Sequence, residues 1–393
     1  MPNLNRRKVT LISPSAGISH SGGAEAFSLE MARRLRPFFD VELLAGHSDD
    51  PGFYPAGGIC RSVAREWVKH PLLSVWMNRI ATHPDIVIEH VTSFFPCLGR
   101  LLTHTPDVIF PCNDYGGLAV AALVRSIKGT PVLYTEHAGS MSGNKPLMRN
   151  LRFHPDELVV FSPETARLVQ QSHPQQSVSV IHNGVDLKRF SPEGNRVPLP
   201  FAEGPVVLCV ASLCRTGHKR VELTLQALAR LPGLNLLICG DGPDRAYYQA
   251  LGEQLLGPDR FAIQTFRFEQ MPDVYRSADL FTLASLDEPC ALSYLEAMAT
   301  GLPVVTTDDP MRRHTIGNAG LLCDVTDPVA YAAALETVSV QPNWQQLACA
   351  NAARFSWDTV IQEYEQVLNR VIERSLATAP RHSTLPRGPA RHI

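Results

Sequence analysis

The chain of 393 residues lacks the features that mark several classes of protein. No apolar run approaches the roughly 18 residues of a membrane-spanning helix, and the N-terminal stretch MPNLNRRKVTLIS has no apolar core like that of a signal peptide. A formal net charge of −2 gives no sign of a nucleic-acid-binding surface. The nine cysteines form no CxxC pair and no zinc-ligand spacing, which indicates free thiols in a reducing compartment. We therefore expect a cytoplasmic protein without a nucleic-acid partner, and a peripheral contact with the inner face of a membrane is compatible with the sequence.

Short apolar runs and turn residues alternate along the chain, and they predict an α/β fold. The length suits two domains of ordinary size, and 45% of the residues are hydrophobic, as in a globular protein. Strands separated by helical segments are typical of a parallel sheet with helices on both faces. In the first half we expect strands at residues 8–13, 41–45, 86–89, 108–110, 132–135, 159–161 and 178–181.

Two domains and a C-terminal helix follow from this pattern. We expect a Rossmann-like, doubly wound domain over residues 1–190 and a second one over 205–355. The segment between them is rich in proline and glycine and is interpreted as a linker. An amphipathic pattern over 356–376 predicts a final helix. The remaining residues, 377–393, are rich in proline and arginine and are expected to be disordered.

The stretch Ser285–Thr307 carries the chemistry that the sequence indicates most clearly. Glu288 and Glu296 are eight positions apart, and a helix is expected to begin between them at about Ala291 and to end at Gly301. The free N–H groups at the start of a helix can bind a phosphate, whereas an acid beside them suits hydroxyl groups of the same ligand. Together they suggest a nucleotide sugar. The alternative is that Glu288 is a solvated loop acid and Glu296 a half-buried helix residue.

The sequence of this stretch resembles a known family. E-x7-E followed by EAMATGLPVV is similar to retaining glycosyltransferases of family 4, which have the GT-B fold of two Rossmann-like domains facing a cleft. GGxE at Gly22, IHNGVDLKRFSP at Ile181 and G-x-G-P at Gly240 stand in the family's order, so the resemblance extends to about Ser375. It implies that the N-terminal domain binds the acceptor, the C-terminal domain binds the nucleotide sugar, and the final helix crosses back onto the first domain.

The resemblance also implies roles for four side chains. His137, after the strand at 132–135, would orient the donor sugar, and Lys219 would neutralise the donor diphosphate. Glu288 would hold hydroxyl groups of the sugar ring, and Glu296 those of the ribose. The reaction implied is transfer from a UDP- or GDP-sugar to a hydroxyl acceptor with retention at the anomeric carbon. No cofactor or metal is required, because side-chain cations and helix N–H groups would stabilise the leaving diphosphate.

Further residues are expected to contact the donor through the backbone or by charge. They are Gly22 and Gly23 in the first glycine loop, Arg215, Gly240 and Arg267 on the nucleotide side, and Ala291, Leu292 and Ser293 at the helix start. His90, Glu89 and Asp114 are candidates for the acceptor side. Asn183–Gly184 is a turn pair for which we expect a mainly architectural role.

Two positions depart from the family's pattern. Ser212 stands where the family often has an arginine, and therefore Arg215 or Arg220 is expected to supply the second positive charge. Cys290–Ala291 replaces the usual Phe-Gly, which narrows the space near the sugar.

Each motif also has a purely structural interpretation. A lone histidine at a strand end is often structural, GGxE can be a plain turn, and a Lys/Arg cluster before a helix is usually a solvated surface. Two other function classes fit the same fold. One is a nucleotide-sugar epimerase or a phosphorylase, and the other is a non-catalytic protein that binds nucleotide sugars. The sequence alone does not identify the sugar, the base, the acceptor or the oligomeric state.

Overall fold

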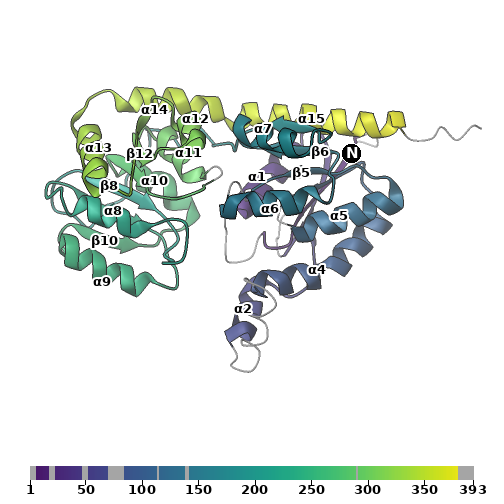
Figure 1. The fold of residues 1–393 in the computed structure, drawn as a ribbon, viewed down its shortest axis with the longest axis horizontal. Helices are drawn as coiled ribbons and strands as arrows, with labels where there is room; N and C mark the ends of the chain where they lie inside the picture. Colours follow the sequence, from purple (N-terminus) through teal and green to yellow (C-terminus); the bar gives the residue numbers. More distant parts are fainter. Residues whose placement is uncertain are drawn as a thin grey trace, which may run out of the picture.

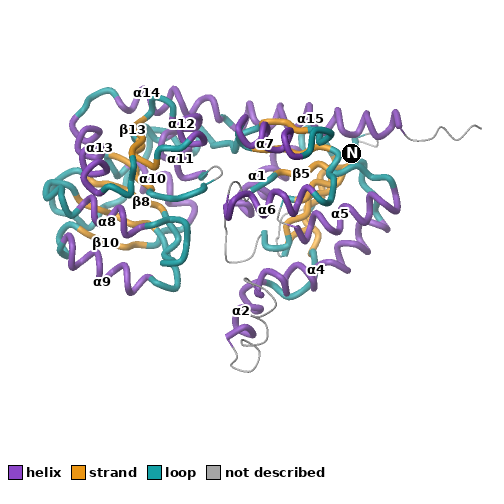
Figure 2. The backbone as a smooth tube through the Cα atoms, in the orientation of Figure 1, coloured by secondary structure: helices purple, strands orange, loops and turns teal. Residues whose placement is uncertain are grey.

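A computed structural model describes residues 6–16, 23–46, 52–69, 84–112, 115–137, 141–288 and 291–378. These residues form two lobes, each a parallel sheet with helices on its faces (Figures 1 and 2). This arrangement confirms the predicted fold class of two doubly wound α/β domains. None of the helices within these ranges is long and apolar enough to cross a membrane.

The sheet of the first lobe is built in two parts that lie side by side. Strands β1 (Lys8–Ser13), β2 (Asp40–Ala45), β3 (Phe53–Pro55) and β4 (Val108–Pro111) pair in the order β3-β2-β1-β4, all parallel. Strands β5 (Leu133–Thr135), β6 (Glu157–Val160) and β7 (Val178–Val180) follow in the order β5-β6-β7. A parallel bridge between Ile109 and Val132 connects the two parts. The strand order reverses between β1 and β4, where ligands bind in such sheets.

The helices of this lobe correct one prediction. They are α1 (Gly23–Leu35), α2 (Arg61–Lys69), α4 (Pro84–Thr103), α5 (Tyr115–Lys128), α6 (Met141–Leu151) and α7 (Pro163–Ser172). The predicted strand at 86–89 is wrong, because these residues belong to α4. Glu89, Ser93, Cys97 and Leu101 recur every four residues on the buried side of α4, which is a helical period. The short apolar run IVI cannot distinguish a strand from a buried helix.

The second lobe contains one six-stranded parallel sheet. Its strands are β8 (Val206–Val210), β9 (Asn235–Cys239), β10 (Phe261–Gln264), β11 (Leu280–Leu283), β12 (Val304–Thr307) and β13 (Gly320–Cys323). They pair in the order β10-β9-β8-β11-β12-β13. The order reverses between β8 and β11, so the loops that follow these two strands meet at the carboxyl edge of the sheet. The site described below lies in these loops.

The helices of the second lobe connect and cover this sheet. They are α8 (Val221–Leu228), α9 (Arg245–Leu256), the 3₁₀ turn η1 (Phe268–Gln270), α10 (Met271–Arg276), α11 (Leu292–Ala299), α12 (Pro310–Ile316), α13 (Pro328–Val340), α14 (Trp344–Ala352) and the 3₁₀ turn η2 (Ala353–Phe355).

The last helix, α15 (Trp357–Thr378), returns to the first lobe and lies across it (Figure 1). Its apolar side, including Tyr364 and Leu368, is part of the first lobe's hydrophobic core. The Tyr364 hydroxyl lies 3.1 Å from the Thr135 hydroxyl. Arg374 forms an ion pair with the buried carboxylate of Glu157, which also accepts hydrogen bonds from two serine hydroxyls. Most of the tail predicted to be disordered, from residue 379 onward, lies outside the described residues.

Gly184 lies where the chain leaves the first lobe, and its missing side chain makes room for Trp357. A Cβ atom on Gly184 would lie 2.3 Å from the Trp357 ring. The neighbouring Val185 N–H donates to the Phe355 carbonyl at 2.8 Å, and Trp357 N–H donates to the Val185 carbonyl at 3.1 Å. The junction thus joins the segment that follows β7 to the start of α15, which agrees with the architectural role expected of this turn.

We predict that Gly184→Ala destabilises this junction. The added methyl must displace the Trp357 ring, and overpacking of this kind costs about 1–3 kcal/mol. The thermal unfolding midpoint should fall accordingly. Gly233→Ala is the matched control, because a Cβ there meets no atom within 4 Å. Equal melting temperatures for the two variants would contradict the packing argument.

Candidate active site

The tripeptide His218-Lys219-Arg220, between β8 and α8, holds the loop that follows β11. The Lys219 ammonium donates to Glu288 Oε2 at 2.5 Å, and His218 Nε2 lies 3.1 Å from the same oxygen. The Leu286 N–H donates to the His218 carbonyl at 2.8 Å. The Arg220 guanidinium donates to the Ala284 carbonyl at 2.7 Å. Three successive residues therefore hold the loop that contains Glu288, at the point where the strand order reverses.

Glu288 is ionised in this environment. Burial alone would raise the pKa of its carboxyl group, but the His218 hydrogen bond and the Lys219 charge outweigh it and lower the pKa to about 2. Both contacts use Oε2. Among the described residues, Oε1 accepts no hydrogen bond and is available to a ligand hydroxyl.

The two arginines expected to supply a second positive charge have other partners. Arg215 lies over the Tyr247 ring, 4.2 Å from its centroid. Arg220 is bound to backbone carbonyls of the β11 loop, and its neighbour Arg312 donates to the Ser285 carbonyl at 2.8 Å. The expectation that either arginine faces the donor is thus not supported by these contacts. His218 is the side chain that joins Lys219 at Glu288. Sequence reasoning missed it because nothing local distinguishes it from the adjacent basic residues.

Glu296 lies in a separate, smaller pocket beside the start of α11. Its Oε2 accepts a hydrogen bond from the Tyr275 hydroxyl at 2.8 Å, and burial raises the pKa of its carboxyl group. Leu292, Arg189 and Phe268 line the same pocket. The Arg189 guanidinium lies 3.7 Å from the centroid of the Phe268 ring. Sequence reasoning placed Phe268 near the base but did not single out Arg189 or Tyr275, because neither lies close in the sequence to Glu296.

The first turn of α11 provides N–H groups that can bind an anion. Ala291 has φ −67°, an ordinary value for alanine, and its side chain makes no capping hydrogen bond. The N–H groups of Leu292 and Ser293 belong to the first turn, where a helix leaves its donors without internal partners. Cys290 lies outside the described residues.

The predicted glycines and Arg267 differ in how closely other atoms pack around them. A Cβ on Gly240 would lie 1.9 Å from the Ala211 carbonyl, so the close approach of the β8 and β9 ends already requires glycine there. Gly23 begins α1 with free space around it, and Gly22 lies outside the described residues. Arg267 is exposed at the start of η1 and its N–H bonds to the Gln270 side chain.

His137 follows β5 in the first lobe and packs against two phenylalanine rings. Its ring makes edge contacts with Phe27 at 4.7 Å and Phe161 at 5.3 Å between centroids. Burial lowers its pKa to about 4, so the imidazole is neutral near pH 7. Its Nε2 is buried without a hydrogen-bond partner among the described residues. Phe27 also lines the pocket that holds Glu296, which links His137 to the second lobe.

Two of the acceptor candidates, Glu89 and His90, lie inside a helix. Glu89 and His90 are buried inside α4, and Asp114 lies outside the described residues. The Arg61 guanidinium donates to Glu89 Oε2 at 2.8 Å, and burial raises the pKa of Glu89. Glu89 therefore supports the packing of α2 on α4.

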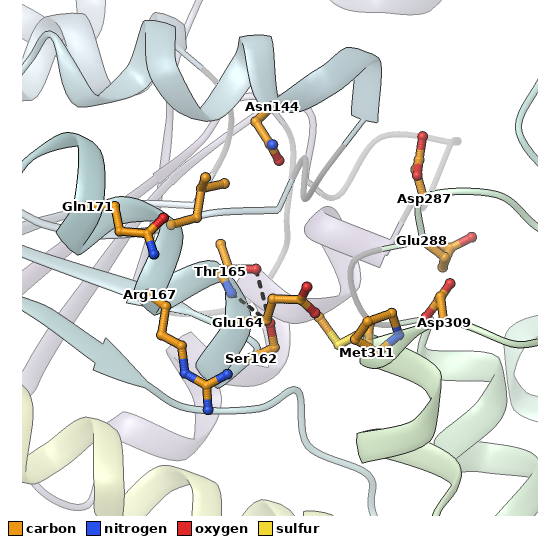
Figure 3. Close-up of a pocket in the computed structure, with 12 residues that line it drawn as sticks. Asn144, Ser162, Glu164, Thr165, Arg167, Gln171, Asp287, Glu288, Asp309 and Met311 are labelled. Carbon is orange, nitrogen blue, oxygen red and sulfur yellow. Dashed lines mark hydrogen bonds between the residues drawn. The ribbon is translucent and has the colours of Figure 1, made fainter.

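A cleft of about 520 Å³ opens between the lobes next to Glu288 (Figure 3). Figure 3 shows Glu164, Arg167 and Gln171 from the first lobe on one side, and Asp287, Glu288 and Asp309 from the second lobe on the other. Residues of both lobes therefore line the cleft. In the described part of the chain no three metal-ligating side chains gather into a metal site.

Comparisons with known proteins match both lobes. Residues 21–189 match the model of Glycosyltransferase Family 4, and residues 193–354 match Glycosyl transferases group 1. The chain is 30% identical to the D-inositol 3-phosphate glycosyltransferase of Mycolicibacterium smegmatis, over 93% of this chain and 91% of that protein.

Solved structures share the fold. Sucrose-phosphate synthase from Thermosynechococcus elongatus superposes with a TM-score of 0.74 at 19% identity, over 94% of this chain and all of that one. Anabaena HepE in complex with UDP-glucose gives a TM-score of 0.69 at 18% identity, over 92% and 99% of the two chains. These likenesses confirm the predicted GT-B arrangement.

We predict that His137 makes stability depend on pH. Its folded pKa of about 4 lies below the ordinary 6.5, so between these values the unfolded chain binds a proton that the folded chain does not. The stability contribution is therefore fully present above pH 6.5 and is lost as the pH falls to 4, by up to about 3 kcal/mol. Urea unfolding of His137→Phe, which keeps an aromatic ring between Phe27 and Phe161, should show a shallower decline than wild type. Parallel curves would contradict the assignment.

Proposed function

Because this chain belongs to glycosyltransferase family 4, we propose that it transfers a sugar from a nucleoside diphosphate sugar to a hydroxyl group of an acceptor, with retention at the anomeric carbon. The observation that carries this proposal is the Lys219–Glu288–His218 cluster at the strand-order reversal, close in the sequence to the start of α11. It combines positive charge for a diphosphate with a carboxylate oxygen for sugar hydroxyls. HepE was solved with UDP-glucose, and starch synthase IV from Arabidopsis thaliana with ADP and acarbose, which supports a nucleotide-sugar donor without fixing its base.

In the proposed mechanism the second lobe, over residues 205–355, binds the donor. Lys219 and the N–H groups at Ala291, Leu292 and Ser293 stabilise the charge that develops on the leaving diphosphate. Glu296, positioned by Tyr275, accepts hydrogen bonds from the ribose. Glu288 accepts them from the sugar ring through Oε1. No metal takes part, because these groups already supply the positive charge.

The first lobe, over residues 1–190, binds the acceptor and completes the sugar site. His137, neutral near pH 7, orients the sugar by a hydrogen bond through its unpartnered Nε2. Glu288 is paired with a cation and strongly acidic, which makes it a poor covalent nucleophile. The acceptor oxygen therefore attacks on the face of the leaving group, and a phosphate oxygen takes its proton. Closure of the lobes excludes water that would hydrolyse the donor.

A thermal-shift panel of UDP-, GDP-, ADP- and TDP-sugars tests the donor class first. A ligand that binds only the folded protein raises its melting temperature. We expect one base to give a clear shift. No shift with any of the four would count against the proposal.

We predict that Lys219→Met and Glu288→Gln each lower turnover of the identified donor by about 100-fold or more, as for other groups that stabilise developing charge. Release of nucleoside diphosphate is the measurement, and melting curves verify folding. Glu336→Gln, an exposed change on α13, is the control and should keep full activity. Wild-type turnover in both site variants would overturn the assignment of these residues.

The stereochemistry has its own test. Proton NMR of the product should show the same anomeric configuration as the donor. An inverted product would refute retention and leave the transferase assignment standing.

A further inference from the structure

Three helices along one edge of the first lobe expose apolar side chains. Helix α2 packs on α4 and α4 packs on α5, and Figure 1 shows them in a row in which α2 lies nearest the second lobe. Each helix has two exposed apolar residues four positions apart, which places both on the same side of that helix. We call these six residues the outer face: Val63 and Trp67 on α2, Val91 and Phe95 on α4, and Leu123 and Ile127 on α5.

The solvent side of α4 is apolar over most of its length. From residue 86 to 99 the exposed residues of this helix are Val91, Phe95, Pro96 and Gly99, and none of them has a polar side chain. A surface helix ordinarily carries polar side chains on its solvent side. Exposed apolar residues that gather on one surface mark a site of interaction, whereas singly scattered ones do not. The outer face therefore has the character of a surface that is covered by a partner.

The same three helices carry an excess of positive charge. Over α2, α4 and α5 the sequence has six lysines and arginines against three aspartates and glutamates. Two of these acids are paired and mostly shielded from solvent, because the Arg61 guanidinium binds Glu89 at 2.8 Å and the Arg65 guanidinium binds Asp85 at 2.9 Å. Lys128, the last residue of α5, is exposed. A net positive charge therefore surrounds the outer face.

We infer that the outer face docks on the surface of a bilayer that contains anionic lipids. Its aliphatic and phenylalanine side chains can enter the boundary between head groups and acyl chains, and the Trp67 indole combines an apolar ring with an N–H for the head groups. The surrounding lysines and arginines attract anionic lipid. No described helix is long and apolar enough to span the bilayer, so the contact is one with its surface. The inference does not depend on the proposed sugar transfer.

Positive charge distinguishes this partner from a second copy of the chain. A two-fold contact brings the same patch of both copies face to face. The excess positive charges of α2, α4 and α5 would then oppose one another, and like charges brought together at an interface are unfavourable. An anionic lipid surface is instead complementary to the outer face in charge as well as in hydrophobicity.

The test is co-sedimentation of the full chain with vesicles of phosphatidylcholine alone and of phosphatidylcholine mixed with phosphatidylglycerol. Wild type should bind the mixed vesicles, and the neutral ones on the order of tenfold or more weakly. The double variant Val91→Ser/Phe95→Ser should bind the mixed vesicles on the order of tenfold or more weakly than wild type. Its matched control is Val329→Ser/Val340→Ser on α13 of the second lobe, because the two pairs are similarly exposed, at 58% and 71% against 58% and 74%. The control should bind as wild type does, and all three proteins should melt at the same temperature.

Several results would overturn the inference. Wild type that binds neither kind of vesicle, or both equally, would refute docking on anionic lipid, and equal losses in the two double variants would refute the outer face as its site. A lower melting temperature in Val91→Ser/Phe95→Ser alone would show that the chain itself covers this face. Light scattering that finds a wild-type dimer and a monomeric Val91→Ser/Phe95→Ser variant would show that a second copy covers it. None of these measurements uses a sugar donor, so the proposed transfer stands or falls separately.

Discussion

The ion pair between Lys219 and Glu288 is the constraint around which the second lobe is arranged. Removing two charges from water is costly, and their mutual attraction compensates only when the geometry is good and the remaining polar atoms are satisfied. Here the sheet order supplies the geometry, because β8 and β11 are neighbours although Lys219 and Glu288 are 69 positions apart in sequence. His218 adds a hydrogen bond to the Glu288 carboxylate, and the carbonyls of the β11 loop accept hydrogen bonds from Arg220. A shift of β8 relative to β11 would therefore change the distance between Lys219 and the Glu288 carboxylate.

The two lobes reach a common cleft through two kinds of connection. Near Gly184 the segment that follows β7 is joined to the start of α15 by backbone hydrogen bonds and by the Trp357 ring. Farther along, α15 is fixed to the first lobe by an apolar side and by the Arg374–Glu157 pair. The helix thereby connects the end of the second lobe to the lobe that contains His137.

Local signals explain what the sequence could predict. The alternation of strands and helices predicted a parallel sheet in each domain. The helix from about Ala291 to Gly301 was predicted correctly because its apolar spacing and its terminal glycine are close together in the sequence. The strand predicted at 86–89 failed because a run of three apolar residues has no period. His218 was not recognised because its partner, Glu288, is 70 positions away. Arg189 was not recognised for the same reason, because its contact, Phe268, is 79 positions away. Gly240 was placed by motif, but the Ala211 carbonyl that requires a glycine there is visible only in three dimensions.

The return of α15 also sets an order of events during synthesis. The first lobe emerges first, yet part of its core, including Tyr364 and Leu368, is encoded at the far end of the chain. At about 5–20 residues per second, residues 191–378 take roughly 10–40 s to translate. Throughout that interval the core residues of the first lobe that pack against α15 lack this partner. The first lobe, although synthesised first, therefore depends on the last helix to complete its core.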